Sequence, residues 1–195
     1  MNRYTIALKD AISMTDEQFY QLCQNNPDLK LERNAQGDLI IMPPTGGETG
    51  RRNASLIFQV YSWNEATRLG VVFDSSTGFK LPNGADRSPD VAWVRQDRWD
   101  ALTPEQQEKF PPLCPDFVIE LLSPSDTLED IQAKMQDYID SGARLGWLIA
   151  PSLRRVEIYR PGQPVEVLEA PTSLSGEAVL PGFILMLDSI YPRSC

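Results

Sequence analysis

The sequence predicts an α/β or α+β fold in which one mixed sheet is flanked by helices. Short apolar runs alternate with segments of helical period along the chain, as they do in proteins whose helices pack on a sheet. The run from Asp116 to Leu122 has apolar residues on both faces, which is typical of a central strand. With 195 residues, 42% of them hydrophobic, the chain can bury one substantial core, so we expect a single domain over residues 1–195.

The N-terminal part is predicted to form a short helix and a β-hairpin, within about residues 15–42. Thr15 and Gln18 have the spacing of a capping box, which predicts a helix from there to about Cys23. Gly37 lies between two apolar runs and supplies the turn of the hairpin.

After a segment rich in proline and glycine, a long helix is predicted from about Glu48 to Leu69. Its apolar face is broad and includes Ala54, Ile57, Phe58 and Tyr61, which indicates burial on more than one side.

The rest of the chain is predicted to alternate between strands and helices. A short helix is expected around residues 104–109. Asp126 and Glu129 have the spacing of a capping box for a helix that stops at Gly142. The tail, residues 180–188, is a final apolar element. Strands are predicted at residues 71–73, 78–81, 90–94, 145–150, 154–159 and 165–169.

Composition excludes several kinds of chemistry. The chain has no histidine, which rules out Ser-His-Asp and Cys-His nucleophilic catalysis and zinc held by histidine. Its three cysteines, Cys23, Cys114 and Cys195, are not at metal-binding spacing and indicate reduced thiols in a cytoplasmic protein. We expect no membrane association, because the sequence has neither an apolar run of about 18 residues nor a signal peptide.

Two carboxylates, Asp90 and Glu120, lie in or beside apolar runs. A buried carboxylate is costly unless it is paired, and two together make an oxygen-rich site suited to Mg²⁺ or Mn²⁺. Asp116 shares a strand with Glu120 but lies about 13 Å away along it, so we interpret it as a strand-entry residue bonded to a loop backbone. Asp90 can meet Glu120 if their strands are antiparallel neighbours.

Lys134 lies on the following predicted helix, at the edge of its apolar stripe. Alone, such a lysine is expected to keep its ammonium in solvent. With the two carboxylates it completes a metal-dependent centre for phosphodiester cleavage. Tyr138, one turn later, is interpreted as a core residue. Glu48 either complements the dipole of the long helix or acts as a further metal or water ligand. Arg51 and Arg52 are candidate phosphate contacts, although most such arginines are simply solvated.

These motifs together resemble the Uma-two-type family of restriction endonucleases, which belongs to the PD-(D/E)XK nuclease superfamily. The resemblance covers nearly the whole chain and implies a restriction-endonuclease-like mixed sheet, with a nuclease core at about residues 48–150 and C-terminal strands at about 153–190. It rests on the runs Ser-Pro-Asp90-Val-Ala-Trp-Val, Pro-Asp116-Phe-Val-Ile-Glu120-Leu-Leu-Ser-Pro-Ser-Asp126, Lys134 with Tyr138 and Gly142, Gly146-Trp-Leu-Ile, and Leu180-Pro-Gly-Phe.

By this resemblance, Asp90 and Glu120 would hold Mg²⁺ or Mn²⁺ together with the backbone carbonyl of Leu121. The superfamily's usual lysine is absent at Leu122, and Lys134 is the matching residue displaced onto the helix. It would position or activate the attacking water.

Glu48 corresponds to the superfamily's helical acid, and Thr49 follows it where the family often has histidine.

The resemblance implies a Mg²⁺-dependent endonuclease that acts on DNA, and a homodimer would suit a double-strand cutter. The net charge of -9 counts against loose binding of nucleic acid. Two alternatives therefore stay open. One is a catalytically silent nuclease-fold domain that binds nucleic acid or protein. The other is a dimeric interaction module that associates through the apolar C-terminal strands.

Overall fold

The computed structural model describes residues 3–8 and 11–192 and confirms the mixed α/β fold class. Its centre is a six-stranded sheet with the order β11-β10-β9-β8-β7-β4, in which only β8 and β9 are parallel. β8 has a neighbour on both sides, as the central-strand prediction required. The strands are β4 (Gly70–Asp74), β7 (Val91–Arg95), β8 (Phe117–Leu121), β9 (Leu145–Ala150), β10 (Arg155–Tyr159) and β11 (Glu166–Glu169).

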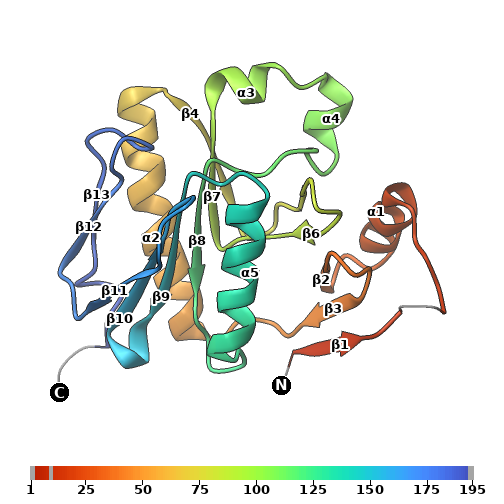
Figure 1. Ribbon diagram of the computed structural model, residues 1–195, viewed down its shortest axis with the longest axis horizontal. Coiled ribbons are helices and arrows are strands. Elements are labelled where there is room, and N and C mark those ends of the chain that lie inside the picture. The colour runs from red at the N-terminus through yellow and green to blue at the C-terminus, as the bar shows by residue number, and fades with distance from the viewer. Residues whose placement is uncertain (1–2, 9–10, 193–195) are drawn as a thin grey trace.

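Helices α2 (Gly47–Thr67) and α5 (Leu128–Asp140) pack on opposite faces of this sheet (Figure 1). Side chains alternate along β8, so that Phe117 and Ile119 join the core under α2 while Val118 joins the core under α5. The parallel pair β8 and β9 needs a crossover, which α5 provides. Glu120 lies two residues after Val118 on the same strand, so its side chain points to the same face, the one covered by α5.

The side chain of Met135 on α5 packs closely against the backbone of β9 at Gly146. A Cβ atom at Gly146 of β9 would lie 2.5 Å from Cε of Met135 on α5. Glycine at this position therefore lets the helix pack directly on the strand.

The C-terminal hairpin covers the same face of the sheet as α2. It consists of β12 (Ser173–Ser175) and β13 (Ile184–Met186), which pair antiparallel. Leu174, Leu185 and the nearby Phe183 are buried in the core under α2. The tail is thus an apolar element, as predicted.

A second sheet lies beside the central one, on the right of Figure 1, with the strand order β1-β3-β2-β6-β5. The predicted hairpin is confirmed as β2 and β3, and the Thr15 capping box is confirmed at the start of α1. The elements of this region are β1 (Tyr4–Ile6), α1 (Asp16–Asn25), β2 (Lys30–Arg33), β3 (Leu39–Met42), β5 (Phe79–Lys80) and β6 (Asp86–Arg87).

Three short helices complete the described elements. α4 (Pro104–Glu108) is the short helix predicted around residues 104–109, and it has its own capping box between Thr103 and Gln106. α3 (Gln96–Asp100) and the 3₁₀ turn at Pro151–Leu153 were not predicted, because each is too short to show a period. No helix in the described ranges is long and apolar enough to cross a membrane. Cys23 and Cys114 are free thiols, and Cys195 lies outside the described residues.

The prediction that α2 is buried on more than one side is wrong. Ala54 is exposed, as are Phe58 (68%) and Tyr61 (51%). The helix contacts the sheet through one face only, since nothing in the described structure packs over its outer side. The buried residues of the helix are Thr49, Leu56, Val60 and Asn64.

The cap predicted for α5 is also wrong by one residue. Thr127 is the N-cap, and its hydroxyl accepts a hydrogen bond from the backbone N–H of Asp130 at 3.2 Å. Asp126 instead accepts hydrogen bonds from the backbone N–H and the hydroxyl of Ser123, and so stabilises the loop before the helix. The predicted stop is confirmed, because the helix ends at Asp140 and Gly142 has a φ of +109°.

Candidate active site

Asp90 and Glu120 lie opposite each other on antiparallel strands. β7 pairs with β8 in the register Val91 to Ile119, and continuing that register by one residue places Asp90 across from Glu120. Each lies two residues from a side chain buried under α5, Asp90 from Ala92 and Glu120 from Val118, so both belong to the α5 face of the sheet. The structure therefore has the antiparallel arrangement that brings the two carboxylates together.

The Asp90 carboxylate is held at both oxygens. Its Oδ1 accepts a hydrogen bond from Nδ2 of Asn53 on α2 at 2.9 Å. Its Oδ2 accepts one from the backbone N–H of Leu121 on β8, also at 2.9 Å. These contacts join Asp90 to the strand that carries Glu120, so the separation of the two carboxylates is fixed by backbone structure.

Lys134 lies between two carboxylates and is almost completely buried, with 3% of the residue exposed. Its Nζ is 2.8 Å from Oε1 of Glu120 and 2.8 Å from Oε1 of Glu32, and it donates a hydrogen bond to the carbonyl oxygen of Ser88 at 3.3 Å. The expectation that a lone lysine here keeps its ammonium in solvent is wrong. Helix α5 packs directly over Glu120, which turns Lys134 inward.

Glu32 is the residue of this cluster that sequence analysis missed. It lies on β2, in the second sheet, and is 1% exposed. Its carboxylate also accepts hydrogen bonds from the backbone N–H of Ser88 at 2.9 Å and from Nη1 of Arg87 at 3.2 Å. The dipeptide Glu32-Arg33 is matched by Asp86-Arg87 in the sequence, and such opposite charges pair across strands. This pair of acid–arginine dipeptides is the sequence signal that could have identified Glu32 as a paired, buried acid.

Tyr138 is fully buried on α5, which confirms its interpretation as a core residue, but its hydroxyl also belongs to the site. The hydroxyl donates a hydrogen bond to Oε1 of Glu120 at 2.9 Å. Burial, with the negative charges of Glu120 and Glu32, raises the pKa of the hydroxyl well above its usual value. Tyr138 therefore acts as a hydrogen-bond donor that fixes one oxygen of Glu120.

The two glutamates that share Lys134 differ in their acidity. Burial raises the pKa of Glu32, but Lys134 and Arg87 outweigh it and hold that pKa at about 2. Burial, together with the negative charges of Asp90 and Glu32, raises the pKa of Glu120 to about 7 against the attraction of Lys134. The attraction of Lys134 thus does not offset the burial of Glu120 and the negative charges beside it.

Glu32, Asp90, Glu120 and Lys134 form the floor of a cleft of about 580 Å³. Five acidic and three basic side chains line it, so the local field favours a cation. The acids are Glu32, Glu48, Asp90, Glu120 and Asp126, and the bases are Arg3, Lys30 and Lys134. Leu121 also lines the cleft, and the metal role of its backbone carbonyl stays a prediction.

The donor set fits a hard divalent cation that is only partly held by protein. No group of three or more Asp, Glu, Cys or His side chains with metal-site geometry occurs in the described part of the chain. Mg²⁺ is commonly bound through one or two carboxylates and keeps several waters or substrate oxygens. Asp90 and Glu120 provide such a pair at the floor of an open cleft, and a bound cation would favour the charged form of Glu120, which burial disfavours.

Glu48 lines the cleft, whereas Arg51 and Arg52 lie outside it. Glu48 begins α2 and lines the cleft, and its carboxylate contacts Nη2 of Arg51 at 3.1 Å and Nη2 of Arg52 at 3.4 Å. Arg51 also donates a hydrogen bond to the carbonyl of Ser189 at 2.9 Å. Neither arginine lines the cleft. The metal role of Glu48 and the phosphate contacts of the arginines stay predictions.

Asp116 is a structural residue at the start of β8. Its Oδ2 accepts a hydrogen bond from the backbone N–H of Arg95 at 2.9 Å and lies 2.9 Å from Nη1 of Arg98. The interpretation as a strand-entry residue is confirmed, but the backbone N–H that it binds belongs to the last residue of strand β7 and not to a loop. Asp116 does not line the cleft.

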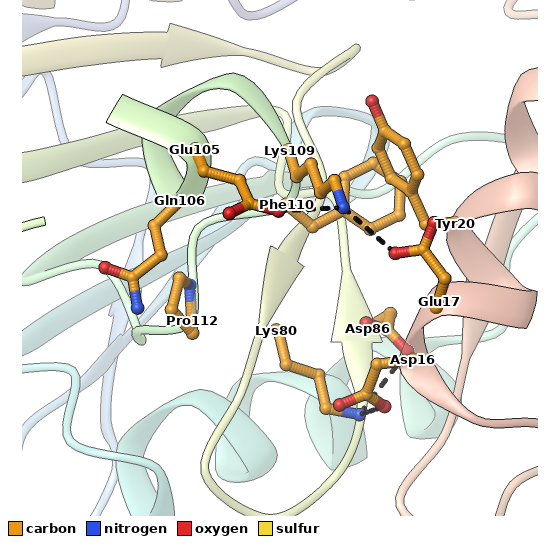
Figure 2. A pocket seen from close by; sticks show the side chains of 10 residues that line it. All are labelled: Asp16, Glu17, Tyr20, Lys80, Asp86, Glu105, Gln106, Lys109, Phe110 and Pro112. Carbon is orange, nitrogen blue, oxygen red and sulfur yellow. Dashed lines mark hydrogen bonds and ion pairs between the residues drawn. The ribbon is translucent and has the colours of Figure 1, made fainter. Parts of the chain in front are cut away.

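A second cavity, of about 200 Å³, lies between α1 and the segment that contains α4 (Figure 2). Its charged groups pair with one another: Lys80 lies 2.6 Å from Asp16, and Lys109 lies 3.0 Å from Glu17. It contains none of the predicted site residues. The larger cleft is therefore the candidate active site.

The fold and this carboxylate–lysine cluster define a protein of the restriction-endonuclease-like nuclease class. Residues 16–188 match the Uma2 family model, described as "Putative restriction endonuclease". That match covers most of the sequence, and the chain belongs to this family.

A solved structure from Anabaena variabilis, described as a putative nuclease belonging to DUF820, is similar in fold. It has 21% sequence identity and a TM-score of 0.76, over 91% of this chain and 97% of that one. No curated protein matches the chain significantly.

Proposed function

We propose that this protein is a Mg²⁺-dependent endonuclease that hydrolyses phosphodiester bonds in DNA. The observation that carries the proposal is the convergence of three groups at the floor of one cleft. Asp90 and Glu120 lie on paired antiparallel strands, and the Lys134 ammonium lies 2.8 Å from Glu120. Family membership and the nuclease described as a structural neighbour support the same chemistry.

In the proposed mechanism, Asp90, Glu120 and the carbonyl of Leu121 would hold Mg²⁺ or Mn²⁺. The bound ion would supply positive charge at the scissile phosphate and increase the acidity of water. The protein's own contribution is to keep the ligands in place. Asn53 and the Leu121 N–H fix Asp90, and Tyr138 fixes one oxygen of Glu120.

Lys134 would act on the reacting groups directly. Its three N–H groups face Glu120, Glu32 and the Ser88 carbonyl, and it lines the cleft, so its contribution would be a fixed positive charge beside the attacking water and the phosphate oxygens. A fixed cation of this kind stabilises negative charge as it develops and needs no rearrangement during the reaction. Glu48, on the cleft wall, would orient a second water or ion.

Charge makes metal and DNA binding depend on each other in this proposal. The chain has a net charge of -9, and acids outnumber bases in the cleft. A phosphate group enters such a cleft only when a cation compensates the carboxylates. Arg3 and Lys30, which also line the cleft, would then provide further positive charge. A homodimer would bring one cleft to each strand of a duplex.

The proposal is tested by incubating supercoiled plasmid DNA with the protein and Mg²⁺ or Mn²⁺. Asp90→Asn, Glu120→Gln and Lys134→Met should each lower the cleavage rate by at least ~10²-fold, since each removes a charge from the reacting centre. Asp116→Asn is the matched control, because it changes a buried, ion-paired acid on the same strand segment outside the cleft. Cleavage that continues at the wild-type rate in all three site variants would remove this cleft from the reaction.

The excess of acids in the cleft also supports a second candidate, a catalytically silent nuclease-fold domain that binds nucleic acid or protein. The two candidates differ in one result. Mn²⁺ binding that depends on Glu120, with no cleavage of single- or double-stranded DNA or of RNA, would favour the silent domain.

A further inference from the structure

We infer that Glu32, on the second sheet, is a positioning residue that holds the Lys134 ammonium at its working place beside the metal-binding carboxylates. The inference rests on the proposed function and deepens it. It means that the active centre is completed by the N-terminal hairpin, outside the two strands and the helix that carry Asp90, Glu120 and Lys134.

The Lys134 ammonium has three N–H groups and three acceptors at hand. They come from three separate segments: Glu120 on β8 and Glu32 on β2, each at 2.8 Å, and the carbonyl of Ser88 after β6 at 3.3 Å. Without Glu32, Glu120 would be the only carboxylate in contact with the ammonium among the residues that the structure describes. The ammonium would then move toward Glu120 and compete with a cation for the same carboxylate.

Glu32 is itself held firmly enough to act as an anchor. It accepts hydrogen bonds from the backbone N–H of Ser88 and from Arg87, and Arg87 forms an ion pair with Asp137 at 2.5 Å. Asp137 lies on α5, one turn after Lys134. The contacts therefore close a ring from α5 through Arg87 and Glu32 back to α5, which ties the catalytic helix to the second sheet.

The test compares Glu32→Gln with Glu157→Gln. Glu157 is an equally buried carboxylate, 1% exposed like Glu32, and it is paired with Arg155 and bonded to Tyr159, but it does not line the cleft. Both variants lose a buried, paired charge, so a general effect on folding appears in both. Only Glu32→Gln should change the reaction.

Two readouts are needed, steady-state cleavage of plasmid DNA with Mg²⁺ and the crystal structure of each variant. For Glu32→Gln we expect kcat to fall by ~10–100-fold with KM changed by less than about two-fold, since Glu32 is inferred to act through Lys134 and not by binding the substrate. The Lys134 Nζ should move by ~1 Å, a displacement large enough to account for that loss. Glu157→Gln should retain the wild-type kcat.

Glu32→Asp provides a second variant that keeps the charge. Its carboxylate ends one carbon short of Lys134, so its kcat should also fall, although less than that of Glu32→Gln. Unchanged kcat in both Glu32 variants, with the Lys134 Nζ unmoved, would overturn the inference. If the wild type cleaves nothing, the proposed function fails, and the position of Nζ in the variant structures then decides the role of Glu32 by itself.

Discussion

The Lys134 ammonium and the Glu120 carboxylate form a buried ion pair, with 2.8 Å between Nζ and Oε1. Burying two charges costs several kcal/mol of hydration that their attraction does not reliably return, so such a pair is weak evidence for a stabilising role. Here the same cluster holds two more carboxylates, Glu32 and Asp90. A fold that keeps this much charge at the floor of one cleft is consistent with a site selected for function at a cost in stability.

Stability should fall as the pH rises toward neutrality because of Glu120. Its pKa is raised by burial to about 7 in the folded protein, from an ordinary value of 4.5. Between these values the native state binds more protons than the unfolded state, so the free energy of unfolding decreases with pH. The shift in the pKa corresponds to a decrease of ~3 kcal/mol in the free energy of unfolding across this pH range. Urea denaturation from about pH 5 to pH 8 measures it.

Glu120→Gln is the control for that measurement, because it removes the titrating group. The decrease in unfolding free energy between about pH 5 and pH 7 should largely disappear in this variant. Equal slopes in the wild type and Glu120→Gln would show that Glu120 titrates normally in the folded protein.

Tyr138→Phe should weaken cleavage with little effect on the fold. The change removes only the hydrogen bond to Glu120, at 2.9 Å, and costs ~1 kcal/mol of stability. Tyr159→Phe is a matched control, since its hydroxyl donates to another buried glutamate, Glu157, at 2.7 Å. Thermal unfolding and plasmid cleavage should separate the two variants. Equal activity in both would mean that the Tyr138 hydroxyl has no part in placing Glu120.

Gly146→Ala should force the buried side chain of Met135 on α5 to move. The new Cβ would lie 2.5 Å from Cε of Met135, and such overpacking typically costs ~1–3 kcal/mol. Met135→Ala in the same chain removes the clash, so the double variant should lose less stability than the two single effects added together. Additive losses, measured by urea denaturation, would contradict a direct contact between helix and strand at this point.

Local sequence patterns were sufficient to predict three residues of the candidate site. Asp90, Glu120 and Lys134 were found because each interrupts or borders an apolar run, and antiparallel pairing of two strands then brings the carboxylates together. Glu32 was missed because its partner lies on α5, about a hundred residues away, and no periodicity within the hairpin reports that contact.

The wrong predictions have a similar origin. Periodicity in α2 shows which residues are apolar but not how many faces of the helix are covered, so Phe58 and Tyr61 were assigned to the interior although they are exposed. At α5, Asp126 and Thr127 are both good capping residues. The structure uses Thr127, because Asp126 is occupied by the Ser123 backbone.

The measurement that tests the central claim most directly is calorimetric titration of Mn²⁺ into the wild type, Glu120→Gln and Asp116→Asn. Asp116 is buried and paired with Arg98 outside the cleft, so its variant controls for the loss of an acid in general. The account predicts binding to the wild type and to Asp116→Asn that is lost in Glu120→Gln. Binding of equal affinity in all three proteins would contradict a metal centre at Asp90 and Glu120.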